Sequence, residues 1–445
     1  MMTPCPNTVD GQLPLRGIRV LDLTHVWSGP MSTRVLAGLG AQVIKLENPR
    51  SPDALRGPGM ADLPLRYPDL EPGPDPRNRN AWFNTQNAGK KDVVIDLKKP
   101  EGLAYALRLV AMCDLVIANY RPGVMERIGL GYDALRQIAA NIVLIEMPGY
   151  VSGSPRANAP AFGAQFDAAS GNATLTGGEE GPLMTGYALG DPTAGLFAAA
   201  AATSALVKAR RTGEGSHIVL PQSEAMIPLL GEYYLAQSVG EPIQEGLNAD
   251  RRCMPHGVYQ TSGGAWLAIA VENDEQWQAL ARNLQAITPG LATKFATAEQ
   301  RHANAPEVTE AVRTWAATVT DPAMTARSLQ SEGVPSAPLQ HAEALSTDPH
   351  LAAASYFQSL THPSCGTHRY PTLPIQIDGR RTAPNTAAPT FAAHTEWCFR
   401  ELIGLDDDAI DDLAVHGVIG LPNKPSTLPP DTYMTAEQAL AKENA

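Results

Sequence analysis

The chain has few cysteines for its length, and none of them lies near another. Five are scattered over 445 residues, at positions 5, 113, 253, 365 and 398, and no C-x-x-C pair occurs. This excludes a disulfide framework and a zinc site built on cysteine pairs. The spacing of histidines and carboxylates suggests no other metal site. We therefore expect a reduced, cytoplasmic protein that holds no metal.

Positive charge and long hydrophobic runs are also scarce. The chain has 34 lysines and arginines against 46 aspartates and glutamates, a net charge of −12. Such a balance argues against nonspecific binding of nucleic acid, although local basic residues can still hold an anionic ligand. No apolar run is long enough to span a bilayer, and the N-terminus lacks the basic stretch and apolar core of a signal peptide. We expect neither nucleic acid nor a membrane among its partners.

A dinucleotide-binding glycine motif is missing as well, since no G-x-G-x-x-G follows the first predicted strand. Instead, the first 150 residues alternate short apolar runs with amphipathic helices. The predicted strands are residues 18–23, 42–47, 93–97, 115–118 and 142–146, and the predicted helices are residues 30–39, 100–112 and 132–139. This alternation is typical of an α/β protein whose parallel sheet is covered on both faces, in a Rossmann-like arrangement.

The pattern changes after this region. A proline-rich stretch at residues 51–80 predicts a long surface loop near a site. A further strand is expected at 216–220, followed by a helix from Gln222 into the 230s. Polar residues from 241 to 255 indicate a linker. A hairpin around residues 262–264 and helices at 275–283, 307–318 and 324–332 then predict a small α+β domain, so that linker and domain together span residues 241–345.

One carboxylate stands at the start of a predicted alanine-rich helix. In the segment Gly190-Asp191-Pro192, the proline suits a first helical turn, and an aspartate just before it is a common N-cap. Asp191 is therefore either a cap or a nucleophile, because a carboxylate can attack an activated acyl group. From this segment alone both interpretations stay open.

Five segments, taken in order, resemble the class III CoA-transferase family, which includes formyl-CoA and carnitine CoA-transferases and α-methylacyl-CoA racemases. They are RVLDLTHVWSGP (19–30), LGAQVIKLE (39–47), NAGKK (87–91), NYRPG (119–123) and the Gly190-Asp191 helix start. No single segment is specific, but their order and spacing are. The resemblance covers nearly the whole chain.

The resemblance implies a CoA-transferase that moves CoA from an acyl-CoA to a small free carboxylic acid. Asp191 would be the covalent nucleophile, passing through anhydride and aspartyl-CoA thioester intermediates. No cofactor would stay bound, because CoA is carried as substrate and product. The reaction needs an ionised aspartate, and we expect the helix N-terminus to lower its pKa.

The resemblance also implies how the chain is assembled. A discontinuous large domain would comprise residues 1–240 and 346–445, with the small domain inserted between them. Two chains would interlock as a homodimer, with a hetero-oligomer of related subunits as the alternative. A non-catalytic, CoA-ester-binding subunit is a further possibility, which the presence of Asp191 disfavours.

By the same resemblance, six residues are expected to contact CoA. For each lysine the alternative is a solvated surface charge, and for the histidine it is packing at a strand end. These candidates are His25, Arg56, Lys90, Lys91, Asn119 and Arg121.

Four aromatic residues are candidates for the acyl pocket: Trp27, Tyr150, Phe162 and Phe166. Trp27 stands where the formyl-CoA transferases have a glutamine, which favours a bulkier or more apolar acid than formate or oxalate. A pocket lined by all four aromatic residues would favour an aryl or branched dicarboxylic acid. Phe162 stands where the racemases have a histidine, and it cannot exchange a proton. An acyl-CoA racemase or epimerase is therefore the disfavoured alternative. For all four residues, core packing is the other interpretation.

Overall fold

The computed structural model describes residues 13–56, 64–177, 181–184, 186–241, 250 and 252–422. The chain divides into two compact units. The first unit comprises Met1–Ser170, Gly186–Leu230 and His350–Ala445, and the second comprises Gly171–Thr185 and Gly231–Pro349. Most of the linker expected at residues 241–255 lies outside the described residues.

Within the described residues, the first unit is built on a six-stranded parallel sheet with the order β3-β2-β1-β4-β5-β6. The parallel α/β architecture predicted from the sequence is thus confirmed. The chain moves outward from β1 in one direction through β2 and β3, and in the other through β4 to β6. Ligands of open α/β sheets bind at such a reversal, beyond the carboxyl ends of the strands. The strands are β1 (Arg19–Asp22), β2 (Gln42–Glu47), β3 (Lys90–Val94), β4 (Leu115–Ala118), β5 (Val143–Glu146) and β6 (Ser216–Val219).

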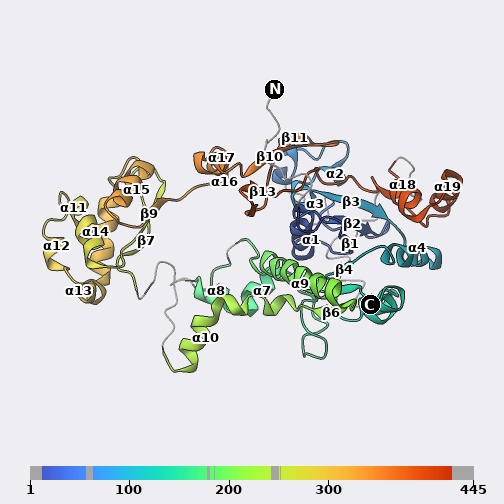
Figure 1. Ribbon diagram of the computed structural model, residues 1–445. Coiled ribbons are helices and arrows are strands. Elements are labelled where there is room, and N and C mark those ends of the chain that lie inside the picture. The colour runs from blue at the N-terminus through green and yellow to red at the C-terminus, as the bar shows by residue number, and fades with distance from the viewer. Residues whose placement is uncertain are drawn as a thin grey trace. The chain divides into compact units, whose positions relative to one another are not determined.

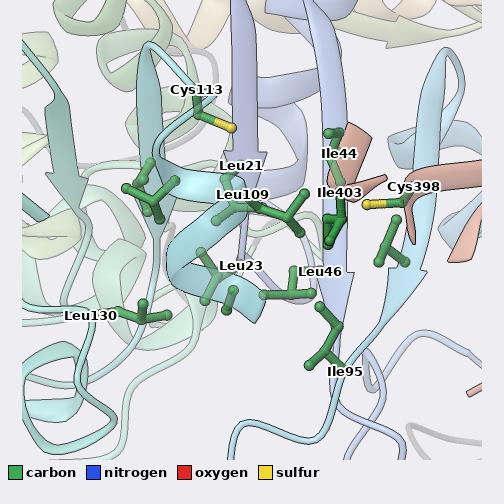
Figure 2. Close-up of a cluster of buried hydrophobic side chains, with 14 of the residues drawn as sticks. Leu21, Leu23, Ile44, Leu46, Ile95, Leu109, Cys113, Leu130, Cys398 and Ile403 are labelled. Atoms are coloured by element: carbon green, nitrogen blue, oxygen red, sulfur yellow. The ribbon is translucent and has the colours of Figure 1, made fainter. Parts of the chain in front are cut away.

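Helices cover both faces of this sheet. Successive residues of each strand point to opposite sides, so each strand contributes apolar side chains to the core on either face. On β1, Val20 packs with α1 (Ser28–Gly38) and α9 (Gly190–Thr212) in one core cluster. Its neighbour Leu21 packs on the other face with α4 (Pro100–Val110), α6 (Tyr132–Ile138) and the C-terminal segment. Figure 2 shows this second cluster, in which Ile403 and Cys398 approach the strand residues Ile44 and Leu46.

The alanine-rich character of α9 is explained by its close approach to α1, beside which it lies in Figure 1. Its buried face consists of small residues such as Ala194, Ala198 and Ala202. At Gly195 a Cβ atom would lie 2.5 Å from the backbone oxygen of Ser28. The absence of side chains therefore allows the helix that carries Asp191 to pack directly against the first helix of the fold.

The second unit has its own antiparallel sheet of β7 (His256–Gln260), β8 (Trp266–Ala270) and β9 (Ser336–Pro338). The hairpin predicted around residues 262–264 is confirmed by the pairing of β7 with β8. The sheet shares a hydrophobic core, centred on the buried Trp277, with helices α11 (Asp274–Leu284), α14 (Ala305–Ala316) and α15 (Pro322–Ser331).

The remaining elements are short. In the first unit they are η2 (Pro64–Arg66), η3 (Pro68–Leu70), α2 (Pro76–Arg79), α3 (Ala81–Asn87), α5 (Val124–Arg127), α7 (Gly163–Ala169), η4 (Gln222–Glu224), η5 (Ile227–Leu230), β10 (Phe357–His362), β11 (Gly366–Pro371), β12 (Gln376–Ile377), β13 (Arg380–Arg381), α18 (Thr395–Trp397), η6 (Cys398–Ile403) and α19 (Asp407–Val415). In the second they are α8 (Asn172–Leu175), α10 (Gly231–Ser238), α12 (Leu291–Lys294), α13 (Ala298–Ala303) and α16 (Ala342–Ser346), and α17 (Pro349–Ala353) bridges the boundary.

Two local predictions differ from the structure, and one element was not predicted. The proline-rich stretch is not one continuous loop, since it contains α2 and two 3-10 turns, and its residues 57–63 lie outside the described part. The helix expected from Gln222 is two 3-10 turns before α10, because Pro228 lacks the N–H that a continuous helix needs. The β10–β11 hairpin was not predicted. Among the described residues, no helix combines the length and the apolar character that crossing a membrane requires.

Candidate active site

A cavity of about 360 Å³ opens at the carboxyl edge of the large sheet, where the chain reverses direction. Its walls come from the segments that follow β1, β2, β4 and β6, together with the starts of α7 and α9. All of them belong to the first unit. The lining residues are His25, Val26, Ser28, Asn48, Ser51, Asn119, Tyr120, Ala161, Phe162, Asp191 and Gln222.

Asp191 is the second residue of α9 and faces this cavity. The position before the helix is held by Leu189, and no side chain there caps the helix. Instead, the N–H groups of Leu189 and Gly190 donate to the two carboxylate oxygens of Asp167, at 3.1 and 2.9 Å. Capping is therefore done by Asp167, and the interpretation of Asp191 as an N-cap is wrong.

A glycine makes room for the Asp191 carboxylate. A Cβ atom on Gly163, the first residue of α7, would lie 2.2 Å from Oδ2 of Asp191 and 2.4 Å from Cβ of Ala188. Any other residue would displace the carboxylate, because real Cβ contacts are never this short. The backbone of Gly163 also forms a hydrogen bond with Asp191. Gly163 thus fixes one side of the carboxylate's position.

The pKa of Asp191 is raised to about 7. Burial is the largest cause and the nearby negative charge of Asp167 is the second, while the hydrogen bond from the Gly163 backbone acts in the opposite direction. This corrects the expectation that the helix N-terminus lowers the pKa. The first amides of α9 point at Asp167, so the helix stabilises the charge of Asp167 instead.

Asn119, which also lines the cavity, joins the segments after β1 and β4. Its side-chain oxygen accepts the N–H of His25 at 2.9 Å, and its Nδ2 donates to the carbonyl of His25 at 2.8 Å. The ring Nε2 of His25 lies 3.3 Å from the hydroxyl of Tyr120. Burial lowers the pKa of His25 and raises that of Tyr120, so both are neutral at pH 7. His25 and Asn119 thus form an uncharged wall, with Asn119 holding the backbone in place.

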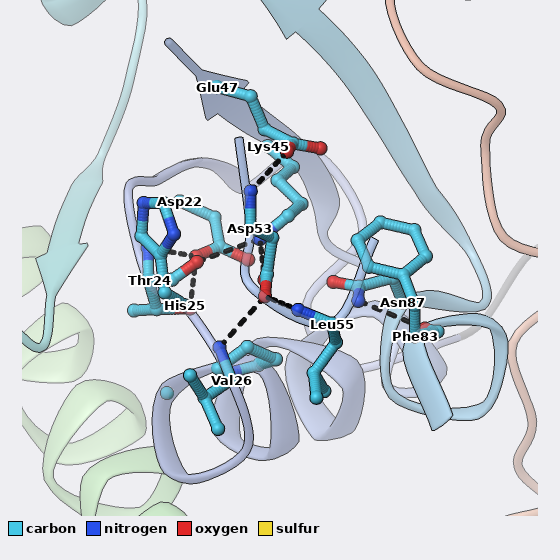
Figure 3. Close-up of polar contacts among 12 residues, drawn as sticks. Asp22, Thr24, His25, Val26, Lys45, Glu47, Asp53, Leu55, Phe83 and Asn87 are labelled. Atoms are coloured by element: carbon cyan, nitrogen blue, oxygen red, sulfur yellow. Dashed lines mark hydrogen bonds and ion pairs between the residues drawn. The ribbon is translucent and has the colours of Figure 1, made fainter. Parts of the chain in front are cut away.

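The next residue, Val26, has a strained backbone. Its φ of 67° lies in the left-handed region, which is costly for a β-branched residue. Its N–H donates to Oδ1 of Asp53 at 3.1 Å, which holds the residue in this conformation. Oδ2 of Asp53 in turn receives the Lys45 ammonium at 2.9 Å (Figure 3). The strain is therefore located in the cavity wall and is maintained by a buried ion pair.

Two of the residues expected to bind CoA lie in the same buried charge network. The ammonium of Lys90 donates to Asp22 at 3.0 Å and to Asn87 at 2.8 Å. The Arg56 guanidinium pairs with Glu47 at 2.6 Å and with Asp92 at 3.1 Å. Lys90 is 2% exposed and Arg56 is 1% exposed. Because their donors are used by carboxylates inside the protein, both residues support the sheet and are not available to a ligand.

The other two basic candidates lie at opposite edges of the sheet. Lys91 is the second residue of β3, at the amino end of the strands, where its ammonium lies 4.3 Å from the ring centre of Trp397. It borders a second cavity, of about 590 Å³, with His394 and Asn385. Arg121 is exposed and follows Tyr120 at the carboxyl end of β4. Of these two residues, only Arg121 is therefore on the same edge as Asp191.

Of the four aromatic candidates, only Phe162 lines the cavity, where it is 51% exposed. Trp27 packs against Trp82, with ring centres 5.5 Å apart. Phe166 is buried beneath the start of α9 and meets Tyr150 edge to face. Trp27, Tyr150 and Phe166 are not among the residues that line this cavity, because their rings pack against other aromatic side chains.

Five polar lining residues were not proposed as site residues: Ser28, Asn48, Ser51, Tyr120 and Gln222. Each follows the carboxyl end of a parallel strand or begins the helix after it. The rule that placed His25 at this edge could have found them. Their types alone gave no signal, because serine, asparagine and glutamine are common in any loop.

The comparisons with known proteins agree on one family. The family model of CoA-transferase family III matches residues 15–395. The chain is 29% identical to the succinyl-CoA–D-citramalate CoA-transferase of Chloroflexus aurantiacus, over 91% of this chain and 98% of that protein. It is 31% identical to the succinate–glutarate CoA-transferase of Agrobacterium fabrum, over 79% and 86%. Among solved structures, a CaiB/BaiF family protein from Brucella suis aligns with a TM-score of 0.76 and 27% identity, over 87% and 99% of the two chains.

The buried charge network generates a stability prediction. Replacing Lys90 by alanine leaves the Asp22 carboxylate buried without its cation, so we expect Lys90→Ala to lower the free energy of unfolding by about 3–5 kcal/mol. Lys98→Ala is the matched control, because Lys98 is exposed, and we expect less than about 0.5 kcal/mol. Urea denaturation followed by circular dichroism measures both. Equal stability of the two variants would contradict a supporting role for Lys90.

Proposed function

The chain belongs to CoA-transferase family III and is a CoA-transferase, and we propose that it transfers CoA from succinyl-CoA to an aliphatic dicarboxylic acid through a covalent intermediate on Asp191. The proposal rests on one observation: Asp191 does not cap its own helix, and it faces a cavity at the carboxyl edge of the sheet. A carboxylate placed in this way can reach an acyl group bound in the cavity.

In the first half-reaction, a carboxylate oxygen of Asp191 attacks the thioester carbonyl carbon of the donor. The carbon–sulfur bond breaks, CoA leaves as a thiolate, and a mixed anhydride joins the donor acid to Asp191. The thiolate then attacks the Asp191 carbonyl carbon of this anhydride. The donor acid leaves as a carboxylate, and an aspartyl-CoA thioester remains.

In the second half-reaction, the acceptor carboxylate attacks the same aspartyl carbonyl carbon and expels the CoA thiolate, which gives a second anhydride. The thiolate then attacks the acceptor's carbonyl carbon and regenerates the Asp191 carboxylate. In every step an anionic nucleophile, a carboxylate or a thiolate, replaces an anionic leaving group. No step therefore consumes a proton or requires a metal. The site needs only to hold the reactants and limit water.

The position and the raised pKa of Asp191 suit the first attack. A carboxylate with a pKa of about 7 is more basic than an aspartate in water, and partial burial removes hydration that would otherwise weaken it as a nucleophile. About half of it is ionised at neutral pH. The ionised fraction that the reaction requires therefore increases as the pH rises through about 7.

For CoA itself, we propose that His25 and Arg121 make contacts, since both lie at the carboxyl edge of the sheet. The exposed guanidinium of Arg121 can pair with a phosphate. Lys90, Arg56 and Lys91 are left out, because two are buried in ion pairs and one lies at the opposite edge. Asn119 acts through the backbone of His25.

The cavity walls favour a small polar acid over an aromatic one. Apart from Phe162 and Tyr120, the side chains that follow the strands are short or polar, such as Ser28, Asn48 and Ser51. Hydroxyl and amide groups recognise carboxylates by hydrogen bonds. The two relatives are named for citramalate and glutarate, which are aliphatic dicarboxylic acids, and we propose an acceptor of this class.

For the assembly, we propose the interlocked homodimer that the family resemblance implies. The helix α9 turns apolar side chains outward, and Leu196 and Val207 are both more than half exposed. Apolar residues grouped on one exposed helix are typical of a surface that a partner covers. A second copy of the chain is the partner we propose.

Trapping tests the covalent step. Incubation with succinyl-CoA and hydroxylamine should convert Asp191 to a hydroxamate, detected by peptide mass spectrometry, and Asp191→Asn should lower turnover by at least about a thousandfold. The rate of modification should rise with pH through a midpoint near 7 and level off above it, as Asp191 becomes fully ionised. Asp133→Asn is the matched control, since Asp133 is the exposed second residue of α6. An unmodified Asp191 in active enzyme would refute the mechanism.

A panel of acids tests the acceptor class. With succinyl-CoA as donor, we expect glutarate and citramalate to exceed benzoate and formate in kcat/KM by at least about tenfold, because the polar wall can bind a second carboxylate and leaves no aromatic pocket. Product formation is followed by chromatography of the CoA esters. Benzoate as the best acceptor would contradict the assignment.

The oligomeric state tests the proposed dimer. Light scattering after size exclusion should give twice the mass of the chain, and Val207→Glu should shift the protein toward the monomer by placing a charge in the interface. Val415→Glu, the same change at an exposed site on α19, should leave the mass unchanged. A monomeric native protein would refute the dimer.

A further inference from the structure

We propose that Asp167 is a positioning residue for Asp191: it caps α9 in place of Asp191, and its negative charge favours the covalently modified form of Asp191 over the free carboxylate. The inference rests on the proposed covalent mechanism. The family resemblance assigned no role to Asp167.

The geometry of Asp167 is that of a cap supplied by another helix. Asp167 is on α7, is 2% exposed, and accepts the N–H groups of Leu189 and Gly190 through its two oxygens. Two charge-assisted hydrogen bonds and the positive end of α9 stabilise its negative charge. It replaces the usual cap, so the start of α9 stays ordered while Asp191 makes no capping bond.

Two glycines bring the carboxylates of α7 and α9 together. A Cβ atom on Gly190 would lie 2.8 Å from Cβ of Phe166 and 3.4 Å from Oδ1 of Asp167. On the opposite side, Gly163 leaves the space that the Asp191 carboxylate occupies. The two helices can therefore approach closely only because both positions lack side chains. The result is a pair of carboxylates from two helices: Asp167 on α7 is buried, and Asp191 on α9 is partly buried.

Two like charges in such a place oppose each other, which is the second cause of the raised pKa of Asp191. The other titratable groups that line the cavity, His25 and Tyr120, are neutral at pH 7 and do not offset this repulsion. When Asp191 becomes an anhydride or a thioester it loses its charge, and the repulsion disappears. The charge of Asp167 therefore raises the free energy of the free carboxylate relative to the acylated enzyme.

The substitution Asp167→Asn tests this inference, because asparagine keeps one capping oxygen and removes the charge. Rapid quenching of the reaction with succinyl-CoA from pH 5 to 9, with mass spectrometry of the Asp191 peptide, gives the rate and extent of acylation. We expect the acid midpoint to fall by about one pH unit and the acylated fraction at high pH to decrease. Asp406→Asn is the matched control, since Asp406 caps α19 away from the cavity. The pH profile of Asp191 acylation in this control variant should coincide with that of the native enzyme.

An unchanged midpoint in folded Asp167→Asn would reduce Asp167 to a helix cap and overturn the inference. If that variant does not fold, Asp167→Ser offers a neutral capping oxygen and is judged in the same way. Carbon-13 NMR of aspartate carboxyls, with Asp191→Asn to assign the signal, measures the titration of Asp191 without a change at 167. A native midpoint near pH 4 would also overturn the inference. Absence of any adduct in the native enzyme would refute the covalent mechanism instead, and the NMR titration would still decide the effect of Asp167.

Discussion

A buried ion pair between Lys45 and Asp53 is the interaction on which the cavity depends. Asp53 uses its other oxygen to accept the N–H groups of Val26 and Leu55, and so it fixes the segment after β1 to the segment after β2 (Figure 3). The pair is part of a network that also contains Asp22–Lys90 and Glu47–Arg56. Removing one member would leave a buried charge unpaired, so the network has to be kept whole.

The two sides of the cavity have different electrostatic characters. On the sheet side, charges are neutralised within the network, and the surface offered to a ligand consists of neutral groups such as His25 and Asn119. On the helix side, Asp167 and Asp191 place two carboxylates together where α7 and α9 meet. Burial and the like charge of Asp167 together raise the free energy of the ionised Asp191 carboxylate relative to its neutral form. The fold thus holds strain both in the Val26 backbone and in the carboxylate pair.

Much of the fold could be predicted from local patterns. Each of the five strands expected in the first 150 residues overlaps a strand of the large sheet, because buried parallel strands are continuous apolar runs. The strand expected at residues 93–97 begins and ends three residues earlier, at Lys90–Val94. The start of α9 was found from Pro192, and Asp191 and His25 were placed at the site. Three of the basic residues expected to contact CoA do not lie at the cavity. Lys90 and Arg56 are buried in ion pairs, and Lys91 is at the opposite edge of the sheet. The sequence does not indicate whether the partner of a charged residue is a ligand or another side chain.

The sequence by itself determined the alternation of strands and helices, the small residues of α9 and the order of motifs that identifies the family. These depend on local propensity and on the period of apolar residues. Only the tertiary structure decided which aspartate caps α9, which charges neutralise one another, and which aromatic ring reaches the cavity. Asp167 and Asp191 are 24 residues apart, and Lys90 and Asp22 are 68 apart. Their interactions arise from contacts between distant elements, so burial and electrostatics assign their roles only after the chain has folded.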